Sequence, residues 1–130
     1  MVEAIRPDTA FVYIFRRADG LFKVGFSANP KHRRAVCSTQ TGVWHEIEYL
    51  WHADYMSALQ AEHSFHYRMR KLKFKGRSSI ELYDLPLDRL VEEIEVAWAK
   101  LGTKPGARAA KMSVPGFIKA VKRARERQRG

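Results

Sequence analysis

Cysteine is almost missing from this chain of 130 residues, which contains only Cys37. A single cysteine excludes an internal disulfide and is typical of a reducing compartment, so we expect a cytoplasmic protein. It also excludes zinc sites built on cysteine pairs, and no metal-ligand spacing links it to His32, His45, His52 or His63.

Long apolar runs are missing as well. No stretch approaches the roughly 20 apolar residues that span a bilayer, so we expect no membrane-spanning segment. The first ten residues, MVEAIRPDTA, lack the basic start and apolar run of a secretory signal. Hydrophobic residues still make up 45% of the chain, which is enough for one modest core.

Acidic residues are scarce at the C-terminal end. Residues 1–99 carry 14 Lys/Arg and 13 Asp/Glu, a net charge of +1, whereas residues 100–130 carry 10 Lys/Arg and only Glu126, a net charge of +9. We therefore divide the chain into a near-neutral domain over 1–101 and a basic linker and helix over 102–130. Such a segment suits an acidic polymer, most often nucleic acid. An anionic membrane, an acidic protein and a merely solubilising tail are the alternatives.

A β-hairpin is predicted between residues 11 and 27. Two runs rich in β-branched and aromatic residues, Phe11–Arg16 and Leu21–Ser27, flank the sequence Ala18-Asp19-Gly20. A three-residue hairpin loop closes well when its last residue is left-handed, and glycine adopts that conformation without strain.

The length of this loop sets which side chains share a face. Three residues pair Tyr13 with Gly25 and Phe15 with Lys23, whereas a two-residue Asp-Gly turn would move Lys23 onto the apolar face. We therefore favour the three-residue loop, which makes Tyr13 and Lys23 diagonal neighbours about 7 Å apart. The apolar face then consists of Val12, Ile14, Phe22, Val24 and Phe26.

Helices are predicted where caps and apolar spacing coincide. Asn29 suits the N-cap and Pro30 the first position of a helix, and apolar residues three or four apart mark two further helices. In a third strand, Ile47, Tyr49 and Trp51 are expected on one face. The expected elements are a helix from Asn29-Pro30 to about Ser38, a strand over Glu46–Ala53, a helix from about Tyr55 to Leu72, an extended segment over Ser78–Leu85, a helix over Leu87–Leu101, a linker over Gly102–Lys111 and a short basic helix that Ser113 caps.

Four residues form an ordered pattern along these elements. Tyr13 ends Phe11-Val12-Tyr13, Gly25 ends Lys23-Val24-Gly25, Arg33 follows eight residues later, and Glu62 begins a Glu-x-x-x-His sequence that ends at His66. Over residues 11–85 the pattern resembles the GIY-YIG nuclease superfamily, and in particular its phage and fungal branch with Lys-Ile/Val-Gly as second tripeptide. The resemblance implies an α+β fold with a small three-stranded antiparallel sheet flanked by helices. It also implies an endonuclease that hydrolyses phosphodiester bonds in DNA.

The resemblance further implies a role for each matching residue. Tyr13 corresponds to the tyrosine that activates or positions the attacking water, and Arg33 to the arginine that stabilises charge on the phosphate. Glu62 corresponds to the carboxylate that holds a single Mg²⁺ or Mn²⁺. We expect the three side chains to open into one pocket. His66 is either a proton shuttle or substrate contact, or a histidine whose nitrogens are satisfied at the edge of the core.

Three positions depart from the family pattern. Phe11 replaces the first glycine, Lys23 replaces the second tyrosine, and Cys37 stands where some members place a histidine one turn after the arginine. Because a nearby cation favours a phenolate, we hypothesise that Lys23 activates Tyr13 electrostatically. The substitution at Lys23 also favours the alternative of a catalytically weak or inactive nucleic-acid-binding module of the same fold.

The basic residues are predicted to anchor DNA through phosphate contacts, with strong salt dependence. A third reading is a small interaction protein whose terminal helix docks on an acidic partner. The predicted DNA-contacting residues are Arg34, Lys119, Lys122, Arg123, Arg125 and Arg127.

Overall fold

The predicted hairpin is the centre of the sheet in the computed structural model, which describes residues 7–73 and 82–109. Its first strand pairs Tyr13 with Gly25 and Phe15 with Lys23, so the register expected from a three-residue loop is confirmed. Gly20 closes the loop with φ +92°, the left-handed conformation that the loop requires. Arg17 and Asp19 form an ion pair of 2.6 Å across the turn.

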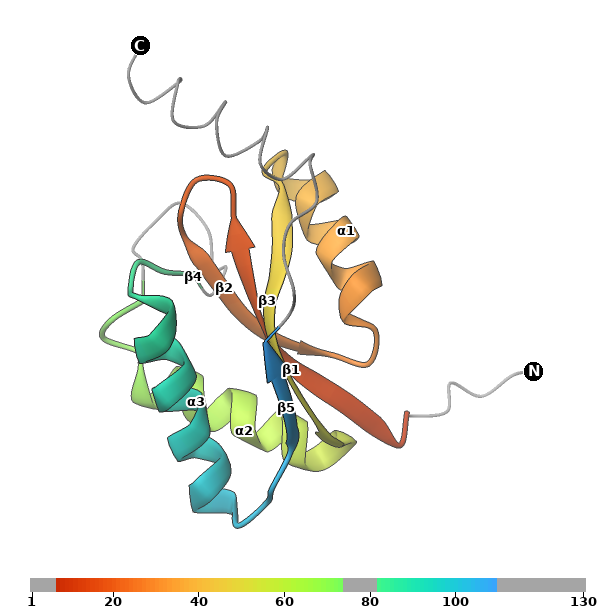
Figure 1. The fold of residues 1–130 in the computed structure, drawn as a ribbon, viewed down its shortest axis with the longest axis vertical. Coiled ribbons are helices and arrows are strands. Elements are labelled where there is room, and N and C mark those ends of the chain that lie inside the picture. Colours follow the sequence, from red (N-terminus) through yellow and green to blue (C-terminus); the bar gives the residue numbers. More distant parts are fainter. Residues whose placement is uncertain (1–6, 74–81, 110–130) are drawn as a thin grey trace, which may run out of the picture.

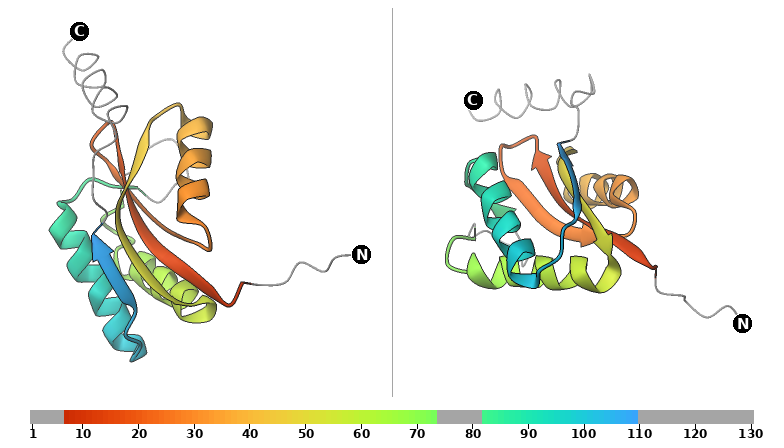
Figure 2. Two further views of the ribbon diagram at one scale, coloured as in Figure 1. Left: turned by 45° about the vertical axis from the view of Figure 1, so that its right-hand side comes forward. Right: turned by 60° about the horizontal axis from the view of Figure 1, so that its bottom comes forward.

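Helices cover both faces of the sheet (Figure 1). Helix α1 lies on one face, whereas α2 and α3 lie side by side on the other, as the two views of Figure 2 also show. In chain order the elements are β1 (Thr9–Arg17), β2 (Phe22–Ser27), α1 (Pro30–Thr41), β3 (His45–Asp54), α2 (Tyr55–Arg68), β4 (Leu82–Tyr83), α3 (Leu87–Leu101) and β5 (Gly106–Ala109).

The sheet has five antiparallel strands in the order β4-β2-β1-β3-β5. The α+β class is therefore confirmed, but the expected number of three strands is wrong. The two additional strands are short edge strands, and β4 falls within the segment predicted to be extended. Strand β5 lies within Gly102–Lys111, which is predicted as a linker from its Gly, Pro, Ala and basic residues, a composition with little β-propensity. Its residues nevertheless pair with Tyr49–His52 of β3, beyond the expected domain boundary at residue 101.

The larger core lies between the sheet and helices α2 and α3. The face of the hairpin that was predicted to be apolar packs here against Trp51, Phe65, Ile94 and Trp98, all 0–1% exposed. Burial of these large side chains supplies most of the driving force for folding. A smaller core of Tyr13, Phe15, Cys37 and Leu50 joins α1 to the opposite face.

A β-bulge in β3 makes one prediction wrong, namely that Ile47 shares a face with Tyr49 and Trp51. Ile14 pairs with Tyr49 and Phe15 with Ile47, so Glu48 has no counterpart on β1. The extra residue reverses the alternation, and Ile47 packs on the smaller core instead of sharing the face of Tyr49. Glu48 is buried, and its carboxylate forms an ion pair with Arg16.

The helices begin where the sequence predicts. The Asn29 side chain accepts a hydrogen bond from the His32 backbone N–H at 3.2 Å, and α3 spans the predicted residues. Helix α1 continues three residues past Ser38, to the left-handed Gly42. Helix α2 ends at Arg68 instead of Leu72, and shortly afterwards Lys73 forms a β-bridge with Tyr83.

No helix within residues 7–73 and 82–109 is long and apolar enough to cross a membrane. The predicted basic helix and the segment 78–81 lie outside the described residues.

Gly25 is expected to tolerate no side chain, because the Tyr13 ring lies directly over it. A Cβ atom at position 25 would lie 2.6 Å from Cζ of Tyr13, whereas one at Gly106 would lie 4.0 Å from its nearest neighbour, the His52 carbonyl oxygen. We predict that Gly25→Ala lowers the free energy of unfolding by about 1–3 kcal/mol, as overpacking does. Gly106→Ala is the matched control in urea denaturation. Equal unfolding midpoints for the two variants would contradict this packing.

Candidate active site

Tyr13 and Arg33 meet at the N-terminal part of α1. Tyr13 projects from β1, and Arg33 lies in the first turns of α1, where the Asn29 cap begins the helix. The two side chains are hydrogen-bonded. A guanidinium can only donate, so the phenol oxygen accepts this hydrogen bond and the phenol O–H can still donate to another acceptor.

The environment keeps Tyr13 protonated. Burial is the largest cause and raises the pKa of Tyr13 above its ordinary value of 10, and the neighbouring Cys37 raises it further. Arg33 lowers the pKa through its hydrogen bond and its charge, but the net direction is upward. The phenol is therefore neutral near pH 7, which suits it for positioning a water or phosphate oxygen.

The charge of Lys23 acts on two histidines near the hairpin. Lys23 pairs with Phe15 and Leu82, and its charge lowers the pKa values of His45 and His66. The charged group that most lowers the pKa of Tyr13 is Arg33. The structure therefore favours Arg33 over Lys23 as the cation that acts on the phenol.

The expected open pocket at Tyr13 is closed in this structure. Tyr13 is 2% exposed, and its ring stacks on Phe15 with a centroid distance of 3.8 Å. Arg33, which is hydrogen-bonded to the hydroxyl, is itself exposed on α1. The hydroxyl end of the phenol thus lies beside a long surface side chain.

Glu62 reaches the same region from the other side of the sheet. It lies on α2, is 8% exposed, and its charge raises the pKa of Tyr13. Strand β2 runs between Tyr13 and Glu62. Strand β4 pairs with only two residues of β2, Phe22 and Lys23. Among the residues that the structure describes, the outer edge of β2 beyond Lys23 has no neighbouring strand.

His66 holds the Glu62 carboxylate. Its Nε2 lies 3.2 Å from Oε1 of Glu62 and 3.1 Å from the Val24 carbonyl oxygen, and its Nδ1 lies 2.7 Å from the Tyr83 hydroxyl. Burial is the main cause that lowers the pKa of His66 to about 3, helped by the charge of Lys73. A neutral ring with both nitrogens engaged favours the reading of a satisfied histidine over that of a proton shuttle.

The donor set for a metal is small. Within the described ranges, no group of three or more His, Cys, Asp and Glu side chains could hold a metal ion. Among the described residues, Glu62 is a carboxylate whose charge acts on Tyr13. One carboxylate fits Mg²⁺, which keeps several waters and commonly takes its other ligands from phosphate.

The Arg34 side chain makes contacts within the protein. Its Nη1 donates to the His45 carbonyl oxygen at 2.9 Å, and its Cζ lies 5.2 Å from the centre of the Trp44 ring. These contacts fasten α1 to the start of β3. The structure thus places Arg34 away from the Tyr13–Arg33 pair, although it is the next residue. The other predicted DNA contacts, from Lys119 to Arg127, lie outside the described residues.

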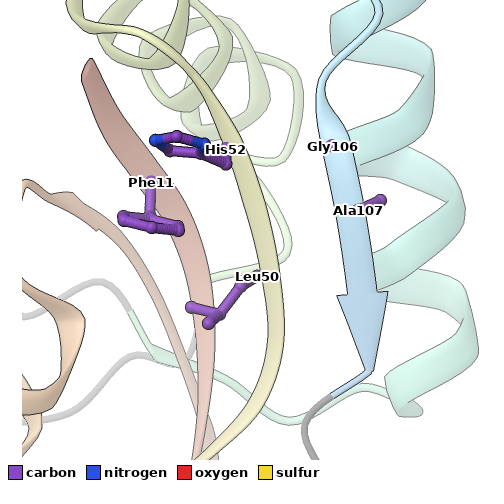
Figure 3. A pocket seen from close by; sticks show the side chains of 5 residues that line it. All are labelled: Phe11, Leu50, His52, Gly106 and Ala107. Atoms are coloured by element: carbon purple, nitrogen blue, oxygen red, sulfur yellow. The ribbon is translucent and has the colours of Figure 1, made fainter. Parts of the chain in front are cut away.

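A pocket of about 360 Å³ opens over β1, β3 and β5 (Figure 3). Its lining includes Leu50, which pairs with Tyr13, and the rings of Phe11 and His52, which stack with centroids 4.4 Å apart. Sequence analysis missed this pocket because β5, which completes it, was read as a linker. It is lined by Phe11, Leu50, His52, Gly106 and Ala107.

Comparison with known proteins gives the family. The T5orf172 domain matches residues 10–98, which is well over half of the chain. The match runs from the second residue of β1 into α3. T5orf172 domains are found in phage and bacterial nuclease-like proteins and are related to endonucleases of the GIY-YIG and HNH types. No curated protein and no solved structure matches the chain. The chain belongs to the T5orf172 domain family.

Proposed function

We propose that this protein is a GIY-YIG-type endonuclease that hydrolyses DNA phosphodiester bonds with the help of Mg²⁺ or Mn²⁺. The observation that carries the proposal is the hydrogen-bonded Tyr13–Arg33 pair with the Glu62 carboxylate close enough to influence the phenol. Membership of a nuclease-associated family supports the same reading.

Arg33 is the group that receives the phosphate. It is exposed, permanently charged and presents planar donors that match two phosphate oxygens. A phosphate that draws the guanidinium away from Tyr13 uncovers the phenol at the same time. Substrate binding and access to the phenol are then coupled through one side chain.

Tyr13 is the group that orients the attacking water. Its O–H donates while its oxygen can accept, so a neutral phenol can hold a water beside the phosphate. A divalent cation on Glu62 would stabilise negative charge on the phosphate and would favour the phenolate. Without added positive charge, burial holds the pKa of Tyr13 too high for it to act as a base at neutral pH.

The second candidate function is a nucleic-acid-binding module of the same fold without turnover. Two observations favour it: Lys23 stands where the GIY-YIG pattern has a second tyrosine, and Tyr13 is 2% exposed. Binding without cleavage would need only the exposed Arg33 and the basic C-terminal segment.

Nicking of supercoiled plasmid in Mg²⁺ or Mn²⁺ tests the proposal. We expect the wild-type protein to nick the plasmid and EDTA to abolish the reaction. Glu62→Gln should reduce the rate by about 10²-fold or more, as the loss of a group that organises charge stabilisation does. The matched control is Glu92→Gln, an exposed carboxylate on α3, which should leave the rate unchanged. DNA retention without any metal-dependent nicking would favour the binding module instead.

The basic segment is expected to supply salt-dependent affinity for DNA. Each phosphate contact that is removed should reduce the slope of log K against log salt by about 0.9 for duplex DNA. Five substitutions in the segment should therefore flatten the slope by several units, whereas three substitutions of exposed lysines on the domain should leave it nearly unchanged. An equal slope for the two variants would contradict a DNA anchor in this segment. The first variant carries Lys119→Gln, Lys122→Gln, Arg123→Gln, Arg125→Gln and Arg127→Gln, and the control carries Lys31→Gln, Lys71→Gln and Lys100→Gln.

A further inference from the structure

A chain of buried side chains leads from β4 to the carboxylate of the candidate site. The Tyr83 hydroxyl lies 2.7 Å from Nδ1 of His66, and Nε2 of the same ring lies 3.2 Å from Oε1 of Glu62. Tyr83 is 0% exposed, His66 6% and Glu62 8%. The three groups are therefore largely shielded from water, where hydrogen-bond geometry has strong energetic consequences.

The partners of the ring determine where its proton lies. Nε2 of His66 faces two oxygen acceptors, the Val24 carbonyl and the Glu62 carboxylate, so Nε2 carries the hydrogen. Nδ1 is then the acceptor of the neutral ring, and the Tyr83 hydroxyl is the donor to it. Tyr83 thus selects the tautomer of His66 that can hold the carboxylate.

Packing holds both rings in this arrangement. The rings of His66 and Tyr83 are nearly parallel, 13° apart, and Phe65 packs edge-on against each, with centroid distances of 5.2 and 5.3 Å. Val24, whose carbonyl accepts from His66, directly precedes Gly25, over which Tyr13 lies. The chain of hydrogen bonds therefore joins α2, β2 and β4 next to the candidate site.

We propose that Tyr83 is a positioning residue: through the Nε2–H tautomer of His66 it fixes the orientation of the Glu62 carboxylate near Tyr13. The inference builds on the proposed function, in which Glu62 holds the divalent cation. In this role His66 transfers no proton, and its Nε2–H stays on the ring throughout turnover. Partners of this kind around metal ligands commonly change metal affinity or activity by about 10- to 100-fold.

The tautomer can be measured without any cleavage assay. In ¹H–¹⁵N correlation spectra of the imidazole, the wild-type protein should show His66 as the Nε2–H tautomer at neutral pH. Tyr83→Phe should introduce a detectable fraction of the Nδ1–H form, because Nδ1 loses its donor. The matched control is Tyr49→Phe, a partly buried tyrosine on the same core, which should leave the tautomer unchanged. A wild-type Nδ1–H form, or a spectrum that Tyr83→Phe does not alter, overturns the proposal.

Substitutions of His66 separate positioning from proton transfer. The side-chain amide of Gln can place a donor near the position of Nε2 but cannot take up a proton at neutral pH. His66→Gln should therefore keep the nicking rate within about tenfold of wild type, whereas His66→Leu should lose the activity that Glu62→Gln loses. Equal losses in His66→Gln and His66→Leu overturn the positioning role.

Metal dependence gives the third readout. Tyr83→Phe should raise the Mg²⁺ concentration for half-maximal nicking by about tenfold, with a smaller change in the rate at saturating Mg²⁺. An unchanged Mg²⁺ dependence overturns the link to Glu62. If the wild-type protein does not nick DNA, the proposed function fails by itself. The tautomer measurement then still decides whether Tyr83 orients His66.

Discussion

The hydrogen bond between Arg33 and the Tyr13 hydroxyl is the contact on which the candidate site depends. It joins β1 to α1 across the smaller core, and it is possible only because Gly25 leaves room for the phenol over β2. Glycine at this position is therefore a steric requirement of the tyrosine opposite it. The two tripeptides that end at Tyr13 and Gly25 therefore describe one packing arrangement, in which the tyrosine ring lies over the glycine.

The same arrangement explains why the site is closed and why its phenol is neutral. Burial raises the pKa of Tyr13, and the exposed guanidinium of Arg33 both caps its hydroxyl and partly offsets this rise. A phosphate that competes for the guanidinium would thus change the charge environment of the phenol. On the other side of β2, Glu62 is buried and contacts His66, whereas Arg33 is a surface side chain.

Turn, capping and apolar-spacing rules predicted the elements whose structure depends on residues close in sequence. The Gly20 turn fixed the hairpin register, and the Asn29 cap and the spacing of apolar residues located α1 and α3. The bulge at Glu48 and strand β5 follow from pairing with distant residues, and neither leaves a signal in its own sequence. Tyr83 was missed for the same reason, because its role depends on the contact with His66, which is 17 residues away.

A double-mutant cycle on the single-turnover cleavage rate tests the central contact most directly. Tyr13→Phe and Arg33→Gln each remove one partner of the hydrogen bond, and their combination removes both. If the two residues act as one unit, the double variant should be about as slow as the slower single variant. Losses that multiply in the double variant would mean that the residues act independently, and would contradict the account of a shared site.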